Sequence, residues 1–171
     1  MLAYEDGFSG VFKVILVLHI LSAIVGIGGV MLNGFYAAQA QKRPGPAGRA
    51  VSEANYAVSN IAEKVIYLVP VFGILLVLAS DDVFQFSDTF VWLSLLLFIG
   101  ALGVSHSILT PGHKKINALL LEMEQSPAPA GGAPPQVTQI QALGKRQAAA
   151  AMVLDLTLTL ILVLMIWQPG R

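Results

Sequence analysis

Four long apolar runs constrain the fold of this chain more than any other feature of the sequence. They cover residues 11–31, 61–79, 90–109 and 148–167. A helix needs roughly 20 mostly apolar residues to cross a hydrocarbon core of about 30 Å, so each run is long enough to span a membrane. Charged residues make up only 12% of the sequence, whereas soluble domains average about 25%. The sequence therefore predicts a multi-pass integral membrane protein.

The predicted fold class is all-α, with one membrane domain over residues 1–171. It is a bundle of four transmembrane helices at about 11–33, 60–80, 89–110 and 147–168. Between the third and fourth helices, residues 111–146 carry two amphipathic stretches on either side of the turn-forming segment SPAPAGGAPP. We expect this part to form a helical hairpin that extends into the cytoplasm.

The charges of the connections predict the orientation in the membrane. The first and third connections carry most of the lysines and arginines, whereas the second carries Asp81, Asp82 and Asp88 and no cation. Cytoplasmic loops are enriched in Lys and Arg. We therefore expect the first and third connections in the cytoplasm and both chain ends on the outer, periplasmic side of a bacterial inner membrane.

The composition excludes several classes of function. The formal net charge of zero gives no electrostatic basis for binding nucleic acid. The absence of cysteine excludes disulfides, thiolate metal sites and covalent c-type haem. No Ser-His-Asp or Cys-His arrangement stands out, so the sequence contains no assembled catalytic group. This favours a function other than catalysis without deciding the question.

Stripes of small and polar residues predict which helix faces turn inward, because such residues mark contacts between membrane helices. The stripes, in chain order, are His19, Ser22, Gly26, Gly29 and Asn33; Asn60, Glu63, Tyr67 and Pro70; Gly100, Gly103, Ser107 and Thr110; and Gly144, Ala148, Ala151, Asp155 and Thr159. In addition, Pro70 is expected to kink the second helix and Pro111 to break the third.

A polar cluster is expected in the cytoplasmic half of the bundle. It comprises Asp155, His106, Lys64 and Glu63, which lie at similar depths when counted from the cytoplasmic edge. A carboxylate near the centre of a membrane helix costs about 2.5–3.5 kcal/mol. Asp155 should therefore have either a structural partner, Lys64 or His106, or a function in proton or ion movement.

His19 has three possible roles. It can bond a backbone carbonyl, ligate haem or copper, or transfer protons. A single haem bridging His19 and His106 is disfavoured, because their expected depths differ by about 12 Å at 1.5 Å per residue.

The segments LHILSAIVGIGG (18–29) and LMIWQPG (164–170) resemble the first and last helices of an uncharacterised bacterial family of predicted integral membrane proteins. The first segment is also distantly similar to CopD-type copper-resistance domains and to HemJ-type protoporphyrinogen oxidases. That similarity implies importance for the first-helix histidine, which is His19 here.

Three functions are compatible with these features. The first is an accessory or scaffold subunit of a larger respiratory or photosynthetic membrane complex, with the bilayer and other membrane subunits or further copies of the chain as partners. The second is a redox or metal-handling protein that binds haem b or copper through His19. The third is proton-coupled transport through Asp155.

Overall fold

The computed structural model describes residues 9–43, 45–125 and 134–170 of the chain. The elements, in order, are α1 (Gly10–Met31), α2 (Asn33–Gln41), α3 (Pro46–Ile66), α4 (Leu68–Leu78), α5 (Thr89–Val104), the π-helix η1 (Ser105–Leu109), α6 (Thr110–Gln125) and α7 (Pro135–Trp167). No β-strand occurs in these ranges. The expected turn at 126–133 lies outside the described residues.

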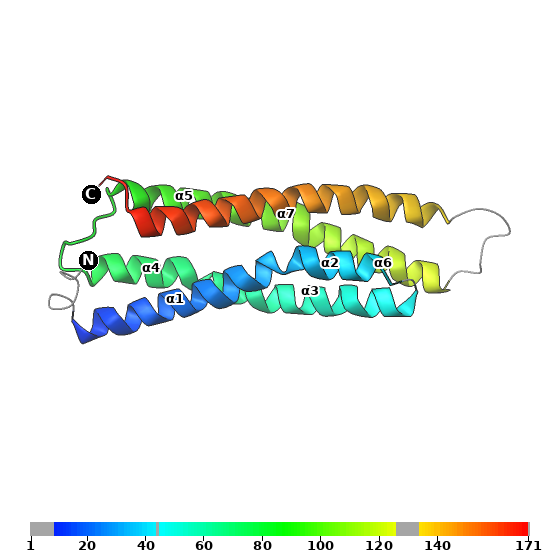
Figure 1. Ribbon diagram of the computed structural model, residues 1–171, viewed down its shortest axis with the longest axis horizontal. Coiled ribbons are helices and arrows are strands. Elements are labelled where there is room, and N and C mark those ends of the chain that lie inside the picture. The colour runs from blue at the N-terminus through cyan, green and yellow to red at the C-terminus, as the bar shows by residue number, and fades with distance from the viewer. Residues whose placement is uncertain (1–8, 44, 126–133, 171) are drawn as a thin grey trace.

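The elements join into four long helical rods that lie side by side along the long axis of the molecule (Figure 1). The rods are Gly10–Gln41, Pro46–Leu78, Thr89–Gln125 and Pro135–Trp167, and each is long and apolar enough to cross a membrane. α1 begins and α7 ends at the same end of the molecule (Figure 1). The predicted all-α fold with four membrane spans is thereby confirmed.

Each rod is longer than a bilayer requires. A helix of 33 residues measures about 50 Å at 1.5 Å per residue, against a hydrocarbon core of about 30 Å. The sequence predicted an extension beyond the apolar runs only for residues 111–146, but α2 and the first half of α3 extend alongside it. Arg49 of α3 lies 2.8 Å from Glu124 of α6, and Ser52 donates a 2.6 Å hydrogen bond to Asn117. The extension is therefore built from all four rods.

Close packing joins α1 to α3. A Cβ added to Gly26 would lie 2.9 Å from Cα of Ile66, and one added to Gly29 would lie 2.6 Å from Cβ of Ala62. Both distances are shorter than carbon atoms tolerate, so the two helices approach this closely only because glycine stands at both positions. The predicted inward face of the first apolar run is confirmed.

The predicted inward face of the third apolar run is wrong. Gly100 and Gly103 are exposed and have open space where a Cβ would stand. The buried face of α5 carries larger side chains instead, among them Phe98 and Ala101, which belong to the core formed with α7. Small residues mark a contact only where a neighbouring backbone comes close, and here side chains fill the space between α5 and α7.

The predicted face of the fourth apolar run is displaced by about one position. The buried residues of α7 are Gln147, Ala150, Leu154, Leu158, Ile161 and Leu164. Asp155 and Ala151 are only partly buried, beside this row. The leucines occupy the core because their larger apolar surface fills the space between the rods.

Candidate functional site

Three of the four rods lose regular α-helical hydrogen bonding part-way along their length. The changes occur at Leu32 between α1 and α2, at Tyr67 between α3 and α4, and in η1 between α5 and α6. Two of these changes are caused by a proline, which has no N–H group to donate to the preceding turn of the helix. Pro70 cannot donate to the carbonyl of Ile66, and Pro111 cannot donate to that of Ser107. α7 alone is a single continuous α-helix among these rods.

A cavity lies at the level of these changes. Its volume of about 50 Å³ is enough for a few water molecules. Its apolar side is contributed by all four rods, including Val30, Ile66, Phe98, Leu154 and Leu158. Its polar side consists of Asn33, Tyr56, Ser59, Asn60, Glu63, Ser105, Thr110 and His113. The π-helix lies directly beside this cavity, because Ser105 and Leu109 are among its lining residues.

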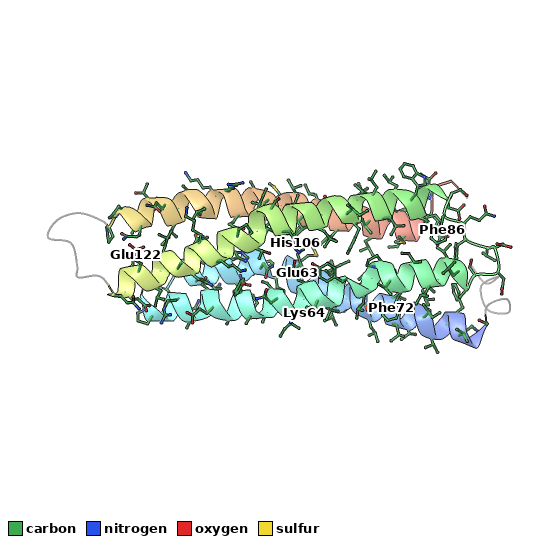
Figure 2. The ribbon with its side chains drawn as sticks, turned by 180° about the vertical axis from the view of Figure 1, so that it is seen from behind. Glu63, Lys64, Phe72, Phe86, His106 and Glu122 are labelled. Carbon is green, nitrogen blue, oxygen red and sulfur yellow. The ribbon has the colours of Figure 1, made fainter. Side chains whose placement is uncertain are left out.

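Glu63 connects this cavity to a histidine at the molecular surface. Its Oε1 lies 3.2 Å from Nε2 of His106, and the hydroxyl of Tyr67 lies 3.0 Å from the same nitrogen. Tyr67 also donates to Oε1 of Glu63 over 3.3 Å. Figure 2 shows Glu63 directed from α3 toward His106. The side chain of His106 is 56% exposed and that of Glu63 only 21%. The hydrogen-bonded group of Glu63, Tyr67 and His106 therefore connects the cavity with the outer surface of the bundle.

The backbone fixes the tautomer of His106. Its Nδ1 lies 3.0 Å from the carbonyl oxygen of Leu102. A carbonyl oxygen only accepts, so Nδ1 must carry a proton. In the neutral ring Nε2 is therefore an acceptor, and it faces Glu63 and Tyr67. The arrangement permits a proton to pass between the Glu63 carboxyl group and this nitrogen.

Gln147 of α7 supports the π-helix from the neighbouring rod. Its Nε2 donates to the carbonyl oxygen of Leu109 at 3.0 Å and approaches that of Ile108 at 3.4 Å. A Cβ on Gly112 would clash with this amide group, so glycine is required there. Sequence reasoning missed Gln147, because its bonding partners are backbone atoms that only the distortion before Pro111 exposes.

The structure brings together only part of the predicted polar cluster. Glu63 and His106 are in contact, whereas Lys64 is exposed and points away from the bundle (Figure 2). The side chain of Asp155 forms no hydrogen bond or ion pair with any residue of the described ranges, and the same holds for Lys64. His113 of α6, which is not part of the predicted cluster, also lines the cavity.

His19 lies apart from the cavity and links α1 to α4. Its Nδ1 is 2.9 Å from the carbonyl oxygen of Val69, and its ring lies beside Gly73, where a Cβ would be 3.3 Å from Cε1. Within the described ranges no group of three or more His, Asp or Glu side chains could hold a metal ion. Haem or copper binding through His19 stays a prediction of the sequence.

Comparison with known proteins gives a family without an assigned activity. No curated protein and no solved structure matches the chain. One family model, described as "Predicted integral membrane protein (DUF2269)", matches residues 13–169. This match covers nearly the whole chain and agrees with the four apolar rods. The chain belongs to this family of predicted integral membrane proteins.

Proposed function

We propose that this membrane protein moves protons, with Glu63 as the group that exchanges them between the central cavity and His106. The observation that carries the proposal is the position of the Glu63 carboxylate. It lines a polar cavity on one side and lies 3.2 Å from Nε2 of His106 on the other. Ionisable residues within membrane spans are rare, face the bundle interior or a water-filled cavity, and mark proton and ion pathways.

The transfer is balanced in atoms and charge. A protonated Glu63 gives its proton to Nε2 of neutral His106, which yields a carboxylate beside an imidazolium ion. The ring lies three residues before the end of the third apolar run. It then releases its Nε2 proton to water at the membrane interface, while Nδ1 keeps its hydrogen bonded to the carbonyl oxygen of Leu102. Tyr67 holds the two side chains together through its hydroxyl group. The side chains of Tyr56 and His113 complete the titratable lining of the cavity.

Proton flux into liposomes tests the proposal. The purified protein is reconstituted with a pH-sensitive dye inside, and an external acid pulse is applied while valinomycin and potassium balance the charge. We expect acidification faster than in empty liposomes, and a fall to the empty-liposome rate in Glu63→Gln. Glu122→Gln is the matched control, because Glu122 is bonded to Gln136 in the extension, far from the cavity (Figure 2).

The same assay separates Glu63 from Asp155, the carboxylate that the sequence suggested for transport. Loss of flux in Asp155→Asn with normal flux in Glu63→Gln would transfer the role to Asp155. A wild-type rate equal to that of empty liposomes would refute proton movement altogether.

A second candidate function is that of an accessory subunit of a larger membrane complex. It is favoured by Asp155, whose carboxylate has no partner in the described part of the chain although it lies within the apolar run of α7. Such a group calls for a partner from another chain. Purification from native membranes in mild detergent should then retain other membrane proteins in fixed ratio, and recovery of the protein by itself would contradict the subunit function.

A further inference from the structure

We propose that copies of this chain assemble head to tail in the membrane, with Asp155 of one copy paired with Lys64 of the next. This proposal concerns assembly and does not depend on proton movement. It rests on two opposite charges that lie at the same level of the bundle and on different sides of it.

The two charges lack partners within their own chain. Neither Asp155 nor Lys64 takes part in an ion pair or side-chain hydrogen bond among the described residues. Other charged groups of the described residues do pair within the chain; Arg49, for example, pairs with Glu53 and Glu124. Both unpartnered residues lie within apolar runs of helices that are long enough to cross the membrane. Little water reaches this depth to screen the charges. An ion pair formed there is therefore stronger than one at an aqueous surface.

The two charges lie at the same level. Asp155 stands between Leu154 and Leu158 in α7, and Lys64 stands between Glu63 and Ile66 in α3. All four of these neighbours line the central cavity described above. Copies inserted in the same orientation therefore present Lys64 and Asp155 at matching depth.

Lys64 lies on the side of α3 that faces away from α1. Ala62 and Ile66 face α1, where they meet Gly29 and Gly26. Lys64 is two residues from each of them, which corresponds to 200° around a helix. Figure 2 shows its side chain projecting from the outer edge of the bundle.

Asp155 lies on the side of α7 that faces the α1–α2 rod. Gly144 is on this side, because a Cβ there would lie 3.8 Å from Nε2 of Gln41 in α2. Asp155 follows Gly144 by eleven residues, which is close to three full turns, so the two share a face. Asp155 is only partly buried and lies along the boundary between α7 and the α1–α2 rod. α3 packs mainly against α1 and α2, and α7 mainly against α5, so Asp155 and Lys64 lie on different sides of the bundle.

Charges on different surfaces of the bundle generate a heterologous contact, in which each copy uses one surface for the preceding copy and another for the following copy. Such contacts form closed rings when the rotation between copies completes a circle. A two-fold dimer is disfavoured, because it would juxtapose like surfaces and leave the pairs unformed. The chain is free of cysteine, which makes cross-linking through introduced cysteines specific.

Charge reversal in separate copies tests the proposal. Asp155→Lys alone and Lys64→Asp alone should each lose assembly, which is measured by light scattering of the detergent-solubilised protein. An equimolar mixture of the two variants should assemble in alternation, because each contact then again joins opposite charges. The mixture also controls for folding, since a misfolded variant cannot be rescued by its partner. Proton flux plays no part in this measurement.

Cross-linking supplies the second measurement. Membranes that contain Lys64→Cys and Asp155→Cys on differently tagged copies should give a mixed disulfide dimer on oxidation. The matched control replaces Asp155→Cys by Leu156→Cys, which is at the same level but on an exposed face. A wild-type protein that is monomeric in both detergent and membranes, or single variants that assemble like the wild type, would overturn the proposal. Failure of the mixture to assemble while each variant is folded would do the same.

Discussion

At the scale of single residues, the glycines of α1 show how one missing methyl group sets the distance between two helices. Gly28 and Gly29 are adjacent in sequence, yet only Gly29 faces Ala62 across the contact with α3, whereas a Cβ on Gly28 meets nothing within 4 Å. The sequence identified the stripe that contains Gly29, because small residues recur there at helical spacing. It could not distinguish this stripe from that of Gly100 and Gly103, since composition does not reveal which helix comes close.

Gly29→Ala should destabilise the protein, and Gly28→Ala should leave its stability nearly unchanged. The added methyl group of Gly29→Ala must displace α3, and overpacking of this kind typically costs about 1–3 kcal/mol. Thermal unfolding in detergent, followed by circular dichroism, measures the difference. The exchange Gly29→Ala with Ala62→Gly moves the methyl group across the interface and should recover part of the loss. Equal unfolding temperatures for the two single variants would contradict the packing described here.

At the scale of elements, the four helices and two of their internal distortions were predictable, but the lengths of the helices and the formation of the π-helix were not. Each apolar run predicted a membrane-spanning helix, because a helix satisfies all the backbone hydrogen bonds of such a segment internally within a bilayer. α2 and the first half of α3 were missed because they continue the helices beyond the apolar residues, where hydropathy gives no signal. The prolines correctly located two distortions. The formation of η1, however, depends on Gln147 of another rod, which no local pattern reveals.

Gln147→Leu should destabilise η1 together with α7, whereas Gln141→Leu should be tolerated. The leucine removes the donor to the carbonyl oxygen of Leu109, and loss of a partner from a buried polar group costs about 1–3 kcal/mol. Gln141 is on the same helix but exposed, so it controls for the change in side-chain type. Amide hydrogen exchange of residues 105–112 should accelerate in the first variant alone. Unchanged exchange there would show that the π-helix does not need this support.

At the scale of the whole molecule, the extension makes the two ends of the bundle different. The rods place α2, the first half of α3, α6 and the first part of α7 at one end, with the start of α1 and the end of α7 at the other (Figure 1). The cavity lies where the apolar runs give way to the extension. The orientation therefore decides which compartment exchanges protons with His106.

Single cysteines in the cysteine-free chain test this orientation. Gln85→Cys lies in the segment between α4 and α5, and Lys42→Cys lies between α2 and α3; both positions are exposed. Because Lys and Arg concentrate in cytoplasmic connections, a membrane-impermeant maleimide should label Gln85→Cys in intact spheroplasts and Lys42→Cys only after lysis. The inverse labelling would place the extension outside. In that case His106 would open toward the periplasmic side, and an acid pulse applied there would reach His106 before Glu63.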